Sequence, residues 1–222
     1  MFRDRTEAGK RLAAEVAALA LRDPVVLALP RGGVPVAWEV AQALAAPLDL
    51  VIVRKVGAPG NPELAAASIV DGDPPDLVPN PEIVAAYGLE DADLRAMAAR
   101  EQLELERRRR VYRAGRPPLP VAGRTAVLVD DGAATGTSMK AAVRAIRRRA
   151  PAAVVVALPV ASSEAVAELS ELADRVVCLD QPPHFEALGY HYGEFHQLRD
   201  AEVLDYLARA SAGRQPETGK PS

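Results

Sequence analysis

The chain has 222 residues, 49% of them apolar and 26% charged, which is typical of a globular protein with a sizeable core. Its formal net charge of −3 gives no global attraction to nucleic acid or membrane, so an anion site must be local. The one cysteine, Cys178, excludes a disulfide framework and lies in an apolar run, which indicates a small buried side chain. Without a signal-peptide core or a long apolar segment, we expect a cytoplasmic protein that does not span a membrane.

Apolar runs and helical spacings alternate along the chain. The predicted helices cover residues 5–21, 34–45, 81–87, 91–113, 137–150, 163–173 and 200–210. The predicted strands cover residues 23–29, 49–56, 124–130, 152–160 and 175–180, with short strands of a side hairpin at 64–70 and 75–78. Continuous β-branched runs that alternate with helices indicate an α/β fold whose central, mostly parallel sheet is flanked by helices on both faces.

Three segments depart from this alternation. Residues 57–116 form an insertion that we expect to be mainly helical, and its first part, GAPGNPE, holds too many Gly and Pro residues for regular structure. Residues 181–199 contain all three histidines and two of the three phenylalanines. Residues 212–222 are predicted to be a disordered tail, which leaves a single domain over residues 1–211.

The run VLVDDGAATGTSMK, residues 127–140, carries the strongest chemical signal. Ligands of a doubly wound sheet bind beyond the carboxyl ends of its strands, where this run lies. Gly132 and Gly136 allow a tight turn, and free amides from about residue 133 to 138, together with the N-terminus of the next helix, suit a phosphate. Further hydroxyl donors are Thr135, Thr137 and Ser138.

The two carboxylates in the run, Asp130 and Asp131, restrict what else can bind beside that phosphate. They would repel a second phosphate, but they accept hydrogen bonds from the vicinal hydroxyls of a ribose. The pattern therefore predicts a sugar phosphate. The chain lacks the G-x-x-x-x-G-K-[ST] motif and lacks G-x-G-x-x-G after a strand, which disfavours a P-loop NTPase and weakens a dinucleotide site.

The same run resembles the phosphoribosyl diphosphate (PRPP) motif of the type I phosphoribosyltransferases. In that motif an apolar strand leads into Asp-Asp, three variable residues and Thr-Gly-x-Thr, and here Ser138 stands in place of the last Thr. LALPRGGVPVAWEV and VRKVGAPGNPELAAASIVDG extend the resemblance to a bacterial subgroup of this family over nearly the whole chain. The resemblance implies the type I phosphoribosyltransferase fold, with residues 181–199 as a hood-like segment.

The resemblance also implies roles for individual residues. The 5′-phosphate of PRPP would bind Gly132, Ala133, Ala134, Thr135, Gly136, Thr137 and Ser138. Pyrophosphate would bind Pro30, Arg31, Gly32, Gly33, Arg54 and Lys55. The candidate catalytic residues are Asp130, Asp131, Lys55 and Arg31. The implied cofactor is Mg²⁺, held mainly by the oxygens of PRPP, with Asp130 and Asp131 as candidate contacts.

In this family the acceptor of the phosphoribosyl group is normally a nitrogen base. Residues 181–199 are suited to cover such a base. Phe185, Tyr190 and Tyr192 are the candidates for stacking on that base. The sequence does not identify the base. Three further side chains, Glu63, Ser68 and Asp71, are weaker candidates for the mouth of the same site.

Alternative functions remain open at this point. The main one is a PRPP-sensing regulatory protein that has lost transfer chemistry and binds RNA or a protein partner; another is hydrolysis or pyrophosphorolysis of a ribose phosphate on the same scaffold. The arginine run 107–110 suits RNA, but Glu101, Glu104 and Glu106 lie just upstream and favour an internally paired, solvated helix. Nucleic acid is therefore disfavoured, and a homodimer is an option because relatives are often dimers.

Overall fold

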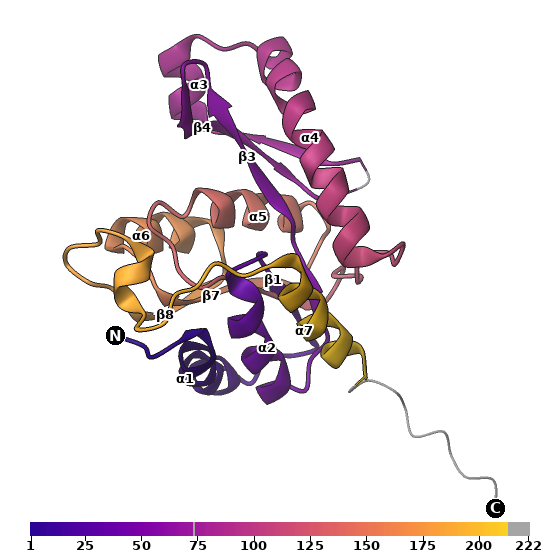
Figure 1. Cartoon of the computed structure of the whole chain (residues 1–222), viewed down its shortest axis with the longest axis vertical. Coiled ribbons are helices and arrows are strands. Elements are labelled where there is room, and N and C mark those ends of the chain that lie inside the picture. The colour runs from indigo at the N-terminus through magenta and orange to yellow at the C-terminus, as the bar shows by residue number, and fades with distance from the viewer. Residues whose placement is uncertain (73, 213–222) are drawn as a thin grey trace, which may run out of the picture.

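The computed structural model describes residues 1–72 and 74–212, except for the side chain of Glu63 (Figure 1). Over these residues the strands form two sheets, and the larger one is parallel throughout with the order β2-β1-β6-β7-β8. Its strands are β1 (Pro24–Ala28), β2 (Leu48–Leu50), β6 (Thr125–Val129), β7 (Ala153–Val160) and β8 (Arg175–Asp180). This sheet is the predicted central sheet, and we call it the main sheet.

Helices cover both faces of the main sheet. They are α1 (Arg5–Ala17), α2 (Gly33–Ala43) and α7 (Asp200–Ala212) on one face, and α5 (Thr137–Arg147) and α6 (Ser163–Leu172) on the other (Figure 1). In β1, Val26 and Ala28 belong to the core under the first set, whereas Val25 and Leu27 belong to the core under the second. Because both sides of the inner strands β1, β6 and β7 leave water, these strands appear in the sequence as unbroken apolar runs. The predicted α/β class is confirmed.

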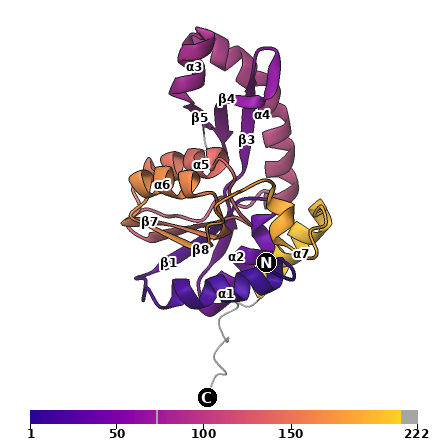
Figure 2. The ribbon, with the colours of Figure 1, turned by 90° about the vertical axis from the view of Figure 1, so that its left-hand side faces the viewer.

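The inserted segment forms a second, smaller unit, which we call the inserted lobe. Its antiparallel sheet has the order β3-β4-β5 among the described residues. The elements of the lobe are β3 (Val53–Ala58), β4 (Asn61–Val70), β5 (Asp76–Pro79), α3 (Pro81–Tyr87) and α4 (Asp91–Arg113). Both helices have their predicted bounds. Figure 2 shows α3 and this sheet at the opposite end of the molecule from α1.

The prediction of one strand over residues 49–56 is wrong. Val51 still donates to the carbonyl of Ala28 in the main sheet, at 2.9 Å, but Ile52 accepts from the amide of Asp71, at 2.8 Å. From Val53 onward the chain belongs to the lobe. The apolar run continues from the main sheet into the lobe because both sheets bury their side chains. The run therefore does not show where the chain leaves one sheet and enters the other.

The Gly- and Pro-rich run 57–63 is also more regular than expected. It closes the hairpin between β3 and β4, with Gly60 at φ 73° in the left-handed region that glycine adopts readily. Pro and Gly thus mark a turn here, and the strands continue on both sides of it.

The C-terminal part contains less regular structure. Residues 181–199 hold one 3₁₀ turn, η1 (Leu188–His191), before α7 begins. Ala212 ends α7, and the remainder of the predicted tail, residues 213–222, lies outside the described residues. None of the helices described here combines the length and the hydrophobicity that crossing a membrane requires.

Candidate functional site

Residues 130–138, which we call the loop 130–138, connect β6 to α5 at the carboxyl end of the main sheet and include the first two residues of α5. Ala133 donates its amide to the carbonyl of Val160 at 3.0 Å, so the free amides begin one residue later than expected. Within the described part of the chain, the amides of residues 134–138 have no protein acceptor. Gly136, at φ 63°, is the N-cap of α5 and has no side chain to cap the helix. The loop therefore offers an anion a run of amides and the positive end of a helix.

Ser162, the N-cap of α6, holds this loop in place. Its amide donates to the carbonyl of Ala133 at 3.0 Å, and its hydroxyl donates to the carbonyl of Ala134 at 2.6 Å. The same hydroxyl accepts from the amide of Ala165 at 3.0 Å. Because the carbonyl and the next amide of a planar trans peptide point in opposite directions, these bonds turn the amides of Ala134 and Thr135 away from α6.

The hydroxyls at the start of α5 lie next to the free amides. The Oγ1 atoms of Thr135 and Thr137 are 3.0 Å apart, and the Thr135 side chain is exposed. Thr137 and Ser138 are half-buried in the first turn of the helix. All three hydroxyls predicted for phosphate binding therefore belong to residues within the run of free amides, 134–138.

The two adjacent aspartates differ in their surroundings. Asp131 is 6% exposed, and its Oδ2 lies 2.7 Å from Nε of Arg5, which is also buried. Arg5 further donates to the carbonyl of His196 at 2.9 Å and lies 3.9 Å from the ring centroid of Phe195. This pair ties the N-terminus of α1 and the hood-like segment to the loop, so the carboxylate of Asp131 is already engaged.

Asp130 is half-buried and has no ion-pair partner among the described residues. Its Oδ1 accepts the amide of Asp131 at 2.9 Å. Burial, and then the negative charge of Asp131, raise the pKa of Asp130 well above its ordinary value. Of the two carboxylates, Asp130 is the one that remains available for a ligand.

The loop 30–33 packs directly against these aspartates. A Cβ atom on Gly32 would lie 2.1 Å from Oδ2 of Asp131, and one on Gly33 would lie 2.7 Å from the carbonyl oxygen of Val129. Both glycines are therefore required by the close approach of the two loops. The peptide between Pro30 and Arg31 is cis, and Nη1 of Arg31 lies 3.6 Å from Oδ1 of Asp200.

The predicted basic pair lies in the inserted lobe, on β3. Arg54 forms an ion pair with Glu101 of α4, with Nη2 and Oε2 2.7 Å apart. Lys55 is exposed and has no ion-pair partner among the described residues. The contacts of Arg54 join it to α4, and none of its ion pairs or hydrogen bonds described here reaches the loop 130–138.

The aromatic candidates of the hood-like segment have different degrees of exposure. Tyr192 is 5% exposed, its ring lies 5.1 Å from that of Phe195, and its hydroxyl donates to the carbonyl of Asp131. It is a core residue, so its ring is not free to stack on a base, contrary to the expectation from the sequence. Phe185 packs on the ring of His191 at 5.0 Å, whereas Tyr190 is 70% exposed.

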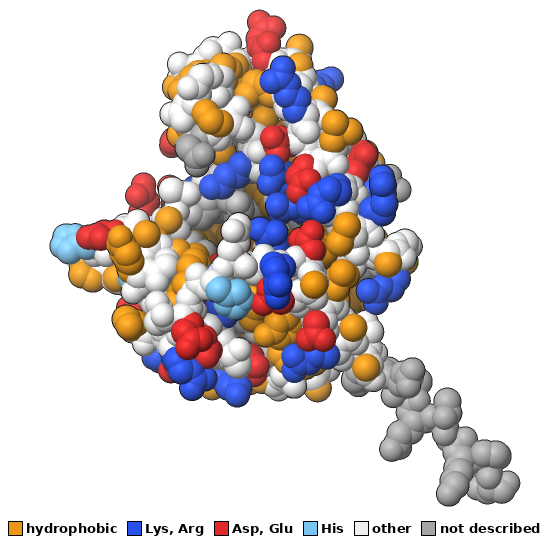
Figure 3. Space-filling model, viewed as in Figure 1, with side chains coloured by type: hydrophobic (Ala, Val, Ile, Leu, Met, Phe, Trp, Pro, Cys, Tyr) orange, Lys and Arg blue, Asp and Glu red, His pale blue; other side chains and the backbone are white. Residues whose placement is uncertain are grey.

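The arginine run 107–110 lies on α4 and is largely paired. The carboxylate oxygens of Glu104 lie 2.7 Å from Nε of Arg107 and 2.9 Å from Nε of Arg108. Nε of Arg109 lies 3.6 Å from Oδ1 of Asp71. Figure 3 shows acidic and basic side chains interleaved on the face that carries α4. The predicted internal pairing is confirmed for Arg107 and Arg108, although Glu101 pairs with Arg54 instead.

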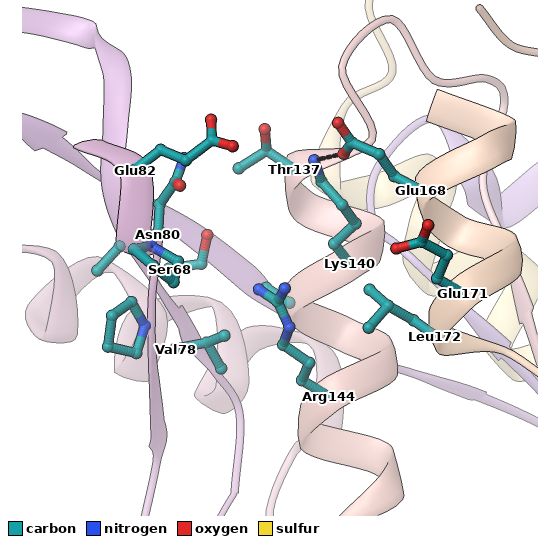
Figure 4. Close-up of a pocket in the computed structure, with 14 residues that line it drawn as sticks. Ser68, Val78, Asn80, Glu82, Thr137, Lys140, Arg144, Glu168, Glu171 and Leu172 are labelled. Carbon is teal, nitrogen blue, oxygen red and sulfur yellow. Dashed lines mark hydrogen bonds and ion pairs between the residues drawn. The ribbon is translucent and has the colours of Figure 1, made fainter. Parts of the chain in front are cut away.

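Of the weaker candidates, Asp71 is buried and accepts from Nε of Arg113 at 2.9 Å, so its carboxylate holds α4. Ser68 lines a cavity of about 360 Å³ between β4, β5 and the helices α5 and α6 (Figure 4). Charges of both signs face this cavity, and Lys140 forms an ion pair there with Glu168. The side chain of Glu63 lies outside the described part of the chain.

Three residues of the site escaped the sequence analysis. Arg5 lies on the same apolar face of α1 as Ala8 and Leu12. A charged residue on a helix face that is otherwise apolar is the sequence signal that could have identified it. Ser162 precedes the pattern of α6 as an ordinary N-cap, which does not reveal its bond to a distant loop. Asp200 opens α7, and only the folded chain brings it to Arg31.

Comparison with known proteins agrees with this geometry. The model of the phosphoribosyl transferase domain matches residues 4–191. Two Mycobacterium tuberculosis proteins, from strains CDC 1551 and H37Rv, are provisionally named phosphoribosyl transferases; each is 45% identical over 210 residues, which are 95% of this chain and 47% of theirs. The chain thus spans about half the length of these curated relatives.

Solved structures agree as well. The crystal structure of TT1426 from Thermus thermophilus has a TM-score of 0.83 at 47% identity, over 94% of this chain and 98% of that one. The protein AQ2163 from Aquifex aeolicus, at 12% identity and a TM-score of 0.51 over 91% of this chain and 84% of its own, shares the fold alone. With the family model over most of its length, this chain belongs to the phosphoribosyl transferase domain family, as its PRPP motif predicts.

Proposed function

We propose that this chain transfers the 5-phosphoribosyl group of PRPP to a nitrogenous, nucleobase-like acceptor and releases pyrophosphate. The observation that carries the proposal is the run of free amides at residues 134–138, at the N-terminus of α5 and next to Asp130. Free amides at a helix N-terminus favour a phosphate. A half-buried carboxylate beside them accepts hydrogen bonds from ribose hydroxyls. Membership of the family supports the same assignment.

In the proposed reaction, the bond from ribose C1 to the pyrophosphate oxygen breaks and a bond from C1 to the acceptor nitrogen forms. The electron pair of the broken bond leaves with pyrophosphate, and the acceptor nitrogen loses its proton to solvent. Catalysis of such a step consists mostly of positioning and electrostatics. The guanidinium of Arg31 and the amides of Arg31 and Gly32 would offset the growing negative charge, with Arg54 and Lys55 as further candidates on the side of the lobe.

The oxygen ligands at the loop 130–138 suit a Mg²⁺ ion that arrives with the substrate. Asp130 offers a hard oxygen ligand, whereas Asp131 is engaged by Arg5. No group of three or more His, Cys, Asp or Glu side chains that could hold a metal occurs among the described residues. We therefore expect the oxygens of PRPP to supply most of the ligands and Asp130 to be the protein contact. When bound, Mg²⁺ would neutralise part of the diphosphate charge.

For the acceptor, we propose the surface next to η1. Leu188 lies close enough to Gly132 that a Cβ on that glycine would be 2.3 Å from Cδ1 of Leu188, so η1 covers the loop 130–138 directly. Tyr190, in the same turn, is exposed and free to contact a planar base. Phe185 is the second candidate, and Tyr192 supports this segment from the core.

Calorimetric titration of PRPP, with and without Mg²⁺, tests the proposal. We expect Mg²⁺-dependent binding that weakens about tenfold or more in Asp130→Asn, because a charged acceptor of the ribose hydroxyls is lost. Asp23→Asn is the matched control, since Asp23 pairs with Arg124 at the other end of the sheet. Absence of PRPP binding by the intact chain would refute the proposal.

Turnover separates the enzyme from its alternatives. With a panel of purine and pyrimidine bases, a transferase releases pyrophosphate only when an acceptor is present. Release without any acceptor would indicate hydrolysis. Binding of PRPP without release under any condition would identify the chain as a PRPP sensor.

A further inference from the structure

Three side chains from distant parts of the sequence converge on one carboxylate. Asp200, the first residue of α7, has its Oδ1 2.6 Å from the hydroxyl of Tyr112 and 3.6 Å from Nη1 of Arg31. Its Oδ2 lies 3.2 Å from Nη1 of Arg107. Two guanidinium groups and one phenol thus share a single anionic group. Arg31 comes from the loop after β1, whereas Arg107 and Tyr112 come from the inserted helix α4.

This carboxylate lies beside the proposed substrate site. Arg31 adjoins Gly32, which presses against the carboxylate of Asp131 at the end of β6. Asp200 therefore lies next to the loop assigned to pyrophosphate. The side chains of Arg31 and Asp200 are 29% and 30% exposed, and that of Arg107 is 47% exposed. A ligand from solvent can reach all three of them.

The bonds made by Asp200 are unequal in strength. Tyr112 and Arg107 donate hydrogen bonds to it, whereas Arg31 approaches only as an ion pair. A carboxylate carries one negative charge, but a diphosphate carries more and has more acceptor oxygens. The guanidinium of Arg31 and the Nη1 side of Arg107, whose Nε and Nη2 donate to Glu104, suit phosphate oxygens because they present several charged donors. A diphosphate would therefore satisfy this set of donors better than Asp200 does.

We propose that Arg107 is a further pyrophosphate-binding residue, and that Asp200 occupies the anion site shared by Arg31 and Arg107 until the diphosphate of the substrate displaces it. The inference rests on the proposed function and adds a residue from the inserted lobe to the site. Glu104, 2.7 Å from Nε of Arg107, keeps the guanidinium in place while its other end changes partner.

The test compares ligands that carry a diphosphate with one that does not. Binding of Mg²⁺-pyrophosphate, Mg²⁺-PRPP and ribose 5-phosphate is measured by calorimetry for the intact chain, Arg107→Gln and Asp200→Asn. For the first two ligands we expect affinity to fall about tenfold in Arg107→Gln and to rise about threefold or more in Asp200→Asn, while ribose 5-phosphate binds all three proteins alike. A merely structural role would alter binding of every ligand.

Matched controls come from the same two helices. Arg95→Gln on α4 and Asp205→Asn on α7 each remove an exposed charge paired within one helix turn, and we expect neither to change binding. If the intact chain binds no PRPP, the proposed function fails. If it binds PRPP but the Arg107 and Asp200 variants bind pyrophosphate like these controls, only the present inference is overturned.

Discussion

The main sheet and the inserted lobe differ in how much charged side chains add to their apolar contacts. In β1 the residues Val25, Val26 and Ala28 are fully buried, between apolar helix faces on both sides. The lobe shares these apolar cores, since Leu105 of α4 lies in one and Val70 of β4 in the other, and arginines add ion pairs where the lobe joins the main sheet. Arg113 is the clearest example, because it joins α4 to Asp49 beside β1 and to Asp71 at the end of β4.

This difference suggests a division of the candidate site between the two regions. The loops 30–33 and 130–138 leave the main sheet and are positioned largely by backbone groups, such as the carbonyl of Val129 against Gly33 and the bond from Ala133 to Val160. The lobe supplies charged side chains whose partners are carboxylates. Ion pairs exchange partners more readily than packed backbones do. We therefore expect the main sheet to set the geometry of the substrate and the lobe to set its electrostatic surroundings.

The largest effect is expected from Arg113→Met. Arg113 is 6% exposed and also donates to the carbonyl of Leu50 at 2.9 Å. Its loss leaves the buried carboxylate of Asp71 with only the 3.6 Å ion pair to Arg109, so the free energy of unfolding should fall by about 3–5 kcal/mol, measured by urea unfolding. Arg95→Met, on the exposed side of α4, should change it by less than about 1 kcal/mol. Equal effects would mean that arginine pairing does not hold the lobe.

Substitution of one glycine in each region tests whether the two regions contribute differently to PRPP binding. A Cβ at Gly32 would meet Asp131, which Arg5 holds in place, whereas a Cβ at Gly57 would lie 2.6 Å from the backbone of Pro62 in the hairpin of the lobe. Each change should cost about 1–3 kcal/mol of stability through overpacking. Only Gly32→Ala should also weaken PRPP binding, by about tenfold or more in calorimetry. Equal loss of binding in Gly57→Ala would contradict the division.

A smaller effect is expected from Ser162→Ala, which tests the backbone anchoring of the loop 130–138. The variant loses an N-cap worth about 1 kcal/mol of stability. It also frees the carbonyl of Ala134, and we expect PRPP affinity to fall about fivefold, as for one lost hydrogen bond. Ser170→Ala is the control on the same helix, since its hydroxyl bonds only to Val166 one turn earlier. Unchanged PRPP binding in Ser162→Ala would show that the loop needs no anchor.

The smallest effect concerns the edge of the main sheet. Burial raises the pKa of Cys178, on β8, to about 11. Since the thiolate is the reactive form, alkylation of the folded protein should accelerate steadily from pH 7 to pH 10 without a plateau. In urea the same rate should level off above the ordinary pKa of about 8.5. A plateau near that value in the folded protein would show that β8 is open to solvent.

Local patterns in the sequence predicted much of this structure. The five parallel strands appear as apolar runs, and α3 and α4 have the predicted bounds 81–87 and 91–113. These features depend on neighbours in the chain, where periodicity and turn residues act directly. The split at Val53 was missed, because burial in either sheet produces the same apolar run.

The candidate site was predictable only in its loops. By itself, the sequence determined that two carboxylates, two glycines and three hydroxyls follow one strand, and that a PRGG turn follows another. Only the tertiary structure decided that Asp131 is buried against Arg5, that Asp200 lies between Arg31 and Arg107, and that Tyr192 belongs to the core. Adjacent identical residues such as Asp130 and Asp131 share every local signal, so only partners from distant elements give them different roles.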